Sequence, residues 1–266
     1  MPDFHLTFLG TGTSQGVPMI GCFCPVCASA DPRDKRSRAS IYVQTPECAF
    51  VVDTGPDFRS QCLRERVGRV DAVLLSHSHT DHIMGFDDLR RFSDLRRVDN
   101  LGGLPVFAAP EHMEDLQRVF AFAFNPKFRF PGYLHVVPHV IEKPFRLGET
   151  TVTPLPVPHG FMDVTGFLFA RGKRKLLAYF SDAKAIPEPV REAVRGVEVL
   201  VVDALRHKPH PTHMSLDEAL ETAAAIEPAQ TLLTHLCHDL SHVETEKTLP
   251  AGVRVAYDGL RLELGK

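Results

Sequence analysis

A short segment in the first third of the chain carries four side chains of types that bind metal ions: His77, His79, Asp81 and His82. The apolar run 70–75 directly before it predicts a buried strand. A loop that leaves a strand end can direct alternate side chains toward one point. We therefore expect His77 and His79 to bind one metal as neutral imidazoles, while Asp81 and His82 face a second metal. Two metals that share a water make it a nucleophile at neutral pH, so the segment predicts a metal-dependent hydrolase.

Three cysteines lie within six residues near the start of the chain: Cys22, Cys24 and Cys27. Three thiolates with one further donor make a closed tetrahedral zinc site, so this spacing predicts a structural zinc. The spacing does not identify the fourth ligand, for which Cys237 and His238 are both candidates. Because we expect a cytoplasmic protein, the clustered thiols favour metal binding over disulfides.

A second polar segment follows the apolar run 198–202 and supplies three histidines and two cations: Arg206, His207, Lys208, His210 and His213. We expect Arg206 and Lys208 to hold a substrate phosphate, and Asp203 to be structural. A histidine here could stabilise a transition state or protonate a leaving oxygen. The residue types leave open which of the three histidines does so.

Several strands must bring these groups together. The pattern of apolar residues predicts strands at these positions: 6–9, 41–43, 49–52, 70–75, 105–108, 150–157, 164–170, 175–180, 198–202 and 230–234. Asp258 and Gly259 predict a two-residue turn between short strands at the end of the chain. We find no linker, so we expect one domain over residues 1–266.

Helices are expected between the strands. The periodicity predicts them over 57–67, 86–97 and 111–124, with two more bracketed by Pro187 and Gly196 and opened by the capping box at Ser215. In the first helix, the apolar residues expected on the buried side are Phe58, Cys62, Leu63 and Val67, and Gly68 would end it. Strand clusters that recur with helices interspersed indicate an α/β fold, with two sheets packed face to face and helices outside.

The sequence His77-Ser78-His79-Thr80-Asp81-His82 resembles the signature of the metallo-β-lactamase superfamily. Four further positions resemble the supporting residue and the later ligands of that superfamily, in the same order along the chain: Asp53, His159, Asp182 and His235. The resemblance covers nearly the whole chain. It implies a four-layer αββα sandwich with the site at one edge of the sheets.

The resemblance also implies a complete set of metal ligands. One metal would be held by His77, His79 and His159, and the other by Asp81, His82 and His235. Asp182 would bridge the two metals. Asp53 would support the metal-binding loop, and Asp81 would also accept a hydrogen bond from the metal-bridging hydroxide that attacks the substrate.

A narrower resemblance comes from residues 9–18 together with the cysteine cluster. These segments are similar to the phosphodiesterases of the carbon–phosphorus lyase pathway, which open phosphoribosyl 1,2-cyclic phosphate. The resemblance implies that His238 is the fourth zinc ligand and that His213 lies over the substrate phosphate. The sequence departs from that group across residues 90–135 and in the cationic segment, so the natural substrate stays open.

Composition limits the range of partners. The 266 residues carry a formal net charge of −3, which gives no strong attraction to nucleic acid or to an anionic membrane. No apolar run approaches the ~20 residues that span a bilayer, and the first residues do not predict a signal peptide. We therefore expect a cytoplasmic protein without a membrane or nucleic-acid partner. The Phe-rich stretch 120–133 favours core packing over a pocket wall or a homodimer contact.

These observations favour a dinuclear phosphodiesterase for a small cyclic or nucleotide-like phosphodiester. The alternatives are an RNA-processing nuclease similar to tRNase Z, a thioester or lactone hydrolase, and a non-catalytic metal-bound carrier similar to a cofactor-synthesis protein. Histidine and carboxylate ligands accept zinc, manganese or iron in the active site, while the cysteine cluster should prefer zinc.

Overall fold

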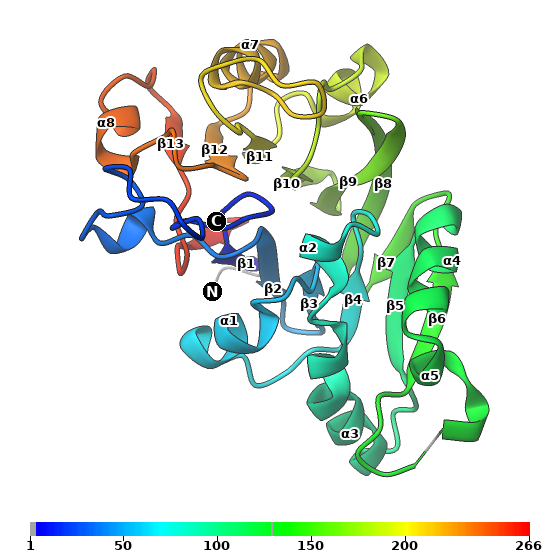
Figure 1. The fold of residues 1–266 in the computed structure, drawn as a ribbon. Coiled ribbons are helices and arrows are strands. Elements are labelled where there is room, and N and C mark those ends of the chain that lie inside the picture. Colours follow the sequence, from blue (N-terminus) through cyan, green and yellow to red (C-terminus); the bar gives the residue numbers. More distant parts are fainter. Residues whose placement is uncertain (1–3, 129) are drawn as a thin grey trace.

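The structure, a computed structural model, describes residues 4–128 and 130–266. Two seven-stranded sheets pack face to face, and helices cover both outer faces (Figure 1). The predicted αββα sandwich is therefore confirmed. In the part of the chain that the structure describes, no helix has both the length and the apolar character needed to cross a membrane.

The first sheet changes from antiparallel to parallel along its width. In spatial order its strands are β14 (Arg261–Leu264), β1 (Phe4–Gly10), β2 (Ser40–Gln44), β3 (Ala49–Val52), β4 (Ala72–Leu74), β5 (Leu104–Ala108) and β6 (Val136–Val140). Strands β3 to β6 run parallel. Their carboxyl ends therefore lie at one edge of the sheet, where loops leaving them can build a site.

The second sheet has the same mixed construction. Its strands are, in spatial order, β13 (Val253–Val255), β12 (Gln230–Thr234), β11 (Val199–Asp203), β10 (Arg174–Phe180), β9 (Met162–Arg171), β8 (Thr150–His159) and β7 (Phe145–Leu147). Strands β10 to β13 run parallel, and β7 to β10 pair antiparallel. The carboxyl ends of β10, β11 and β12 again share one edge.

The helices divide between the two outer faces. The first sheet is covered by α1 (Phe58–Glu65), α2 (Thr80–Ile83), η2 (Phe86–Leu89), α3 (Arg90–Val98), α4 (Pro110–Val119) and α5 (Ala121–Phe124). The second is covered by α6 (Glu188–Val194) and α7 (Leu216–Ile226), and α8 (His242–Glu246) packs beside β13. Two single 3-10 turns, η1 (Pro32–Asp34) and η3 (Pro126–Phe128), lie in loops. Ser215 caps α7 with the predicted capping box.

The core between the sheets follows from side-chain alternation along the strands. In β3, Phe50 and Val52 face the inner core, whereas Val51 faces the helices outside. The ring of Phe50 stacks on Phe169 of the opposite sheet, with 5.4 Å between ring centroids. Packing of the two inner faces therefore sets how the two ligand-bearing edges meet.

One predicted helix differs in its buried side and its end. Helix α1 buries Phe58 and Gln61, and Leu63 is 63% exposed. Two residues along a helix turn the side chain by about 200°, so Leu63 points away from the face of Gln61. Arg66 adopts a left-handed backbone with φ of 55° and ends the helix before Gly68.

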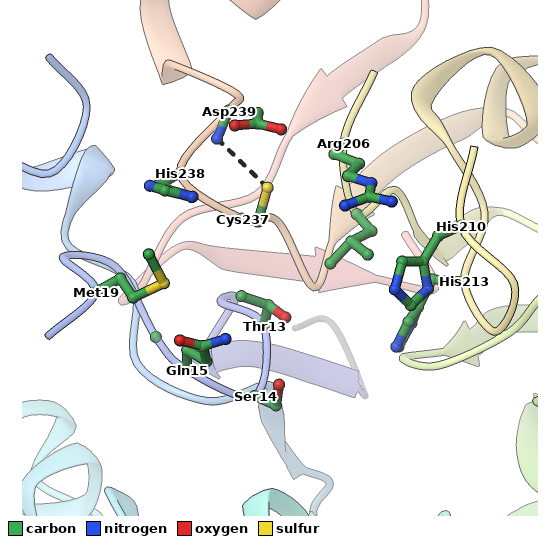
Figure 2. A pocket seen from close by; sticks show the side chains of 12 residues that line it. Thr13, Ser14, Gln15, Met19, Arg206, His210, His213, Cys237, His238 and Asp239 are labelled. Carbon is green, nitrogen blue, oxygen red and sulfur yellow. Dashed lines mark hydrogen bonds between the residues drawn. The ribbon is translucent and has the colours of Figure 1, made fainter. Parts of the chain in front are cut away.

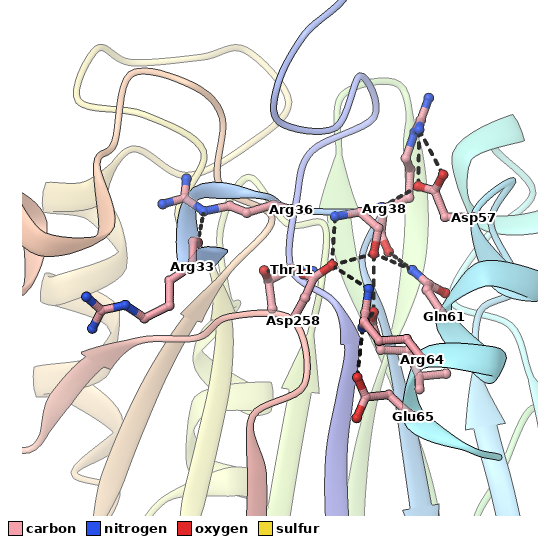
Figure 3. Close-up of polar contacts among 11 residues, drawn as sticks. Thr11, Arg33, Arg36, Arg38, Asp57, Gln61, Arg64, Glu65 and Asp258 are labelled. Carbon is pink, nitrogen blue, oxygen red and sulfur yellow. Dashed lines mark hydrogen bonds and ion pairs between the residues drawn. The ribbon is translucent and has the colours of Figure 1, made fainter. Parts of the chain in front are cut away.

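The turn predicted at Asp258 and Gly259 does not close a hairpin. The strands on either side, β13 and β14, belong to different sheets, so the chain crosses from one sheet to the other. The polar contacts of Asp258 explain why an aspartate occupies this position (Figure 3). Its carboxylate accepts hydrogen bonds from the backbone and hydroxyl groups of Thr11 and Ser37, at 2.6 to 2.9 Å. Asp258 thereby joins the C-terminal crossing to the N-terminal loop.

Candidate metal-binding active site

All seven side chains implied as active-site ligands lie at the edge where the two sheets meet. They come from the loop after β4 and from helix α2, and from the ends of β8, β10 and β12: His77, His79, Asp81, His82, His159, Asp182 and His235. They form two groups, each with its ligand atoms within 4.8 Å of one another. One group is His77, His79 and His159, and the other is Asp81, His82, Asp182 and His235.

Asp182 occupies the middle of this arrangement. Its Oδ1 lies 3.2 Å from His82 Nε2, and its Oδ2 lies 3.3 Å from His235 Nε2. It also lies within 4.8 Å of His159, which belongs to the first group. The side chain is therefore close to both groups.

The buried atoms that face the centre lack hydrogen bonds. Within residues 4–128 and 130–266, four such atoms are buried without a hydrogen-bond partner: His77 Nε2, His82 Nε2, His235 Nε2 and Asp182 Oδ1. Buried polar atoms nearly always have a partner, because desolvation without one costs free energy. Imidazole nitrogens and carboxylate oxygens are ligands for divalent ions such as zinc. These side chains therefore fit a pair of metal ions.

Residues outside the cluster orient the histidines. His82 Nδ1 donates a hydrogen bond of 2.8 Å to Asp53, which is fully buried and also accepts from the backbone and hydroxyl of Ser76. His159 Nδ1 donates to the carbonyl of Thr212 at 2.9 Å. Each bond leaves Nε2 of the ring to face the cluster. Metal-binding histidines commonly donate their other ring nitrogen to a carboxylate or carbonyl in this way. Asp53 thus supports the loop in the way the resemblance implied.

The local electrostatics favour neutral rings at three of the positions. Burial lowers the pKa of His77 well below its usual value, lowers that of His159, and lowers that of His235 to about 3. Burial also opposes charge on Asp182, but His235 and His82 hold the pKa of its carboxyl well below the usual range. Neutral imidazole and ionised carboxylate are the forms that bind metals.

The pKa of His82 shifts in the opposite direction. Burial opposes its charge, yet the carboxylates of Asp182 and Asp53 raise the pKa of His82 well above its usual value. The two carboxylates therefore stabilise positive charge at this ring. A cation facing Nε2 would satisfy the same field without a proton on that nitrogen.

His213 is held beside the cluster by Asp203. Its Nδ1 donates a 2.7 Å hydrogen bond to Asp203, and its ring stacks on His235 with 4.6 Å between centroids. Burial opposes charge on His213, but the Asp203 carboxylate raises its pKa. Sequence reasoning missed this role of Asp203, which we had expected to be structural. The position of Asp203 at the end of β11, between the ends of β10 and β12, was the available signal.

Two adjoining cavities open onto these residues and share Ser14 and His213. The first, of about 350 Å³, is lined by Ser14, His79, Asp81, His159, Phe161, Met162, Asp182, Thr212, His213 and His235. The second, of about 220 Å³, lies between the N-terminal loop and the 206–213 segment, and Figure 2 shows Arg206 and His210 at its side. Ser14, Phe161, Met162 and Thr212 line the first cavity, although their types and spacing did not predict them as site residues.

The polar residues of the 206–213 segment contribute unequally to the two cavities. Arg206 and His210 line the second cavity, whereas His207 and Lys208 are exposed and are not among the described residues that line either one. Arg206 donates from Nε to the carbonyl of Lys208 at 3.1 Å. The structure thus brings Arg206, but not the side chain of Lys208, to the site.

The cysteine cluster assembles with one of its two candidate partners. His238 Nδ1 lies 3.2 Å from the sulfur of Cys22, 3.4 Å from that of Cys24 and 3.7 Å from that of Cys27. The sulfur of Cys237 instead accepts a hydrogen bond from the backbone of Asp239. A backbone hydrogen bond from Cys27 lowers the pKa of Cys24 to about 6, which favours the thiolate. We call Cys22, Cys24, Cys27 and His238 the cysteine knuckle.

Known proteins resemble this chain in sequence and in fold. The profile of the β-lactamase superfamily domain matches residues 49–236. A crystal structure of a new diphosphatase from the PhnP family shares 41% identity and a TM-score of 0.89, covering 98% of this chain and 97% of that one.

Two curated relatives are longer than this chain. An octanoyltransferase of Porphyromonas gingivalis is 34% identical over 257 residues, which are 95% of this chain and 50% of the relative. A ribonuclease Z of Bradyrhizobium sp. (strain ORS 278) is 29% identical over 195 residues, which are 72% of this chain and 58% of the relative. The chain thus spans about half the length of these relatives. The profile match and the PhnP-family structure together place the chain in the metallo-β-lactamase superfamily, where it resembles the PhnP family.

Proposed function

We propose that the chain is a dinuclear metal-dependent phosphodiesterase that acts on a small cyclic or nucleotide-like phosphodiester. The observation that carries the proposal is the pair of ligand groups around Asp182. Four inward atoms of these groups, one each on His77, His82, Asp182 and His235, are buried without a hydrogen bond to any described residue. The likeness to a PhnP-family diphosphatase supports phosphoryl chemistry. We assign one ion to His77, His79 and His159, the other to Asp81, His82 and His235, and a bridging role to Asp182.

The residues around the ions then have separate tasks. Two divalent ions held by these residues would lower the pKa of a bound water toward neutral and offset negative charge on the phosphoryl oxygens. Asp81 accepts a hydrogen bond from the attacking water and so orients it. His213, whose pKa the Asp203 carboxylate raises, donates a proton to the leaving oxygen. Asp203 holds the His213 ring in the orientation that this transfer requires.

The scissile phosphodiester is assigned to the first cavity, among the metal ligands, and a further phosphate contact is assigned to the adjoining second cavity. Arg206 lines it. Its Nε and Nη2 donate to carbonyls of its own segment, and its Nη1 donates to no described residue. A guanidinium in that position pairs with a phosphate oxygen. Lys208 was expected beside it. Its exposure limits it to attracting an anionic substrate from solution.

The cysteine knuckle is assigned a structural zinc. Its four donors are thiolate and imidazole, which form closed tetrahedral zinc sites. Fully buried Arg36 holds the same region, since its guanidinium donates to the carbonyls of Cys237 and Leu240 at 3.1 and 2.7 Å. Zinc would therefore fasten the N-terminal loop to the segment that follows His235.

RNA processing is the second candidate, because one relative is a ribonuclease Z. The net charge of −3 weighs against it, since nucleic-acid binding draws most of its affinity from phosphate neutralisation. Cleavage of a precursor tRNA by the purified chain, at a rate above that for small phosphodiesters, would favour this candidate over ours.

The proposal is tested with bis(p-nitrophenyl) phosphate and added Mn²⁺, beside a panel of cyclic phosphates, thioesters and lactones. We expect phosphodiester hydrolysis that Asp182→Ala lowers by more than about a hundredfold. Asp99→Ala, an exposed aspartate at the end of α3, is the matched control. Normal turnover by folded Asp182→Ala would refute the bridging role. A chain that binds metals and cleaves no ester would instead be a carrier.

A further inference from the structure

The turn between β8 and β9 carries an aromatic side chain into solvent. Strand β8 ends at His159, β9 begins at Met162, and Gly160 and Phe161 form the turn between them. Phe161 has a relative exposure of 112%, the highest among the large apolar residues that the structure describes. A single exposed apolar residue needs no explanation by itself, so its surroundings must decide whether it matters.

Its surroundings are those of the active site. Phe161 lines the 350 Å³ cavity together with His79, Asp81 and Asp182. Among the described residues that line this cavity, Phe161 and Met162 are the only apolar ones. The other exposed phenylalanine of comparable degree, Phe23, belongs to the loop of the cysteine knuckle and is not part of this lining. The apolar surface of the site is therefore concentrated at the turn.

The turn is held in place rather than free. The ladder of β8 and β9 continues without interruption to the pair His159 and Met162. Gly160 has φ of +68°, and a Cβ at that position would lie 2.7 Å from Thr212 Cγ2. Thr212 also accepts the hydrogen bond of His159 through its carbonyl. Because the turn is braced on two sides, little conformational freedom is lost when a ligand contacts Phe161.

We propose that Phe161 is a specificity-determining residue that stacks on a planar aromatic ring of the substrate. The ring would be a nucleobase or a similar group, attached on the side of the scissile phosphodiester that faces the turn. This inference rests on the proposed function, which places the phosphodiester among the histidines and aspartates of the same cavity. A ligand whose ring stacks on an aromatic side chain binds more tightly whatever the hydrogen-bonding pattern of that ring, because every base has a π-face.

The test compares two ligands that differ only in the ring. Adenosine 5′-monophosphate and ribose 5-phosphate share the sugar and the phosphate, and their dissociation constants from the metal-loaded chain can be measured by titration calorimetry. We expect the adenosine compound to bind roughly tenfold more tightly. Phe161→Ala should bring that ratio close to one, and Phe161→Tyr should retain it. Phe130→Ala removes another exposed phenylalanine, one outside both cavity linings, and is the matched control.

An unchanged ratio in folded Phe161→Ala, or no preference in the unaltered chain, would overturn the inference. Hydrolysis of bis(p-nitrophenyl) phosphate separates this outcome from failure of the proposed function. Turnover without a ring preference refutes only the role of Phe161. A ring preference that Phe161→Ala abolishes, in a chain without turnover, supports the stacking site and refutes the phosphodiesterase.

Discussion

The two metal-type clusters of this chain are built in opposite ways. The active-site cluster draws its side chains from both sheets, and five of its seven side chains are buried. The cysteine knuckle draws three of its four side chains from one loop, and only Cys27 among them is buried. Five side chains of the first cluster line the 350 Å³ cavity, whereas only His238 of the knuckle is among the described residues that line either cavity. That difference fits the proposed roles, an open catalytic site for the first cluster and a closed structural zinc site for the second.

One short segment joins the two clusters. His235 and His238 are three residues apart in the loop after β12, and each belongs to a different cluster. His235 has a left-handed backbone with φ of 57°, which turns the chain sharply at the end of the strand. The knuckle therefore adjoins the segment that carries His235, a proposed active-site ligand. The following changes test whether the two clusters have separate tasks.

The largest effect is expected from His79→Ala. His79 is the exposed member of its group, so its loss should disturb folding least while removing a ligand. We expect turnover to fall on the order of a thousandfold, or about 4 kcal/mol, with one active-site metal lost. Kinetics and metal analysis measure both, and His207→Ala is the control. Retained turnover would contradict the assigned ligand.

Cys24→Ser should act on stability rather than on chemistry. Opening the closed site removes one zinc per chain and lowers the free energy of unfolding by roughly 2–4 kcal/mol. Turnover should fall far less than in His79→Ala, because Arg36 still holds the carbonyls of Cys237 and Leu240. Metal analysis and urea denaturation check the expectation. Full zinc content in this variant would argue against a knuckle metal.

Asp53→Asn should weaken the active site from outside. The amide cannot hold His82 as the carboxylate does, because it lacks the charge that stabilises the ring. We expect metal affinity or turnover to fall roughly 10- to 100-fold, or about 1.4–2.7 kcal/mol. Titration with Mn²⁺ separates weaker metal binding from slower chemistry. An unaffected variant would show that His82 needs no outer support.

The smallest effect is expected from Cys237→Ser. The sulfur of Cys237 contacts the backbone of Asp239 and lies outside the knuckle, so zinc content should not change. The free energy of unfolding should change by less than about 1 kcal/mol. His238→Ala, in contrast, should lose the zinc. The reverse pattern would make Cys237 the fourth ligand.

Residues close together in sequence were predictable, because a strand followed by a loop sets their directions locally. This holds for the run from His77 to His82 and for the capping box at Ser215. Predictions that needed a neighbour from elsewhere in the chain were weaker. The spacing of the cysteines could not choose between Cys237 and His238 as the fourth ligand. The helical periodicity predicted Leu63 on the buried side of α1, but the structure exposes it.

By itself, the sequence determined the local order of strands, helices and ligand-type residues, because periodicity and capping act over a few neighbouring positions. Only the tertiary structure decided that Asp203 pairs with His213, that Asp258 joins a crossing between sheets, and that Phe161 borders the active-site cavity. The physical reason is that parallel strand ends from two separate sheets converge at one edge. That convergence depends on how the inner faces pack, which no short stretch of sequence specifies.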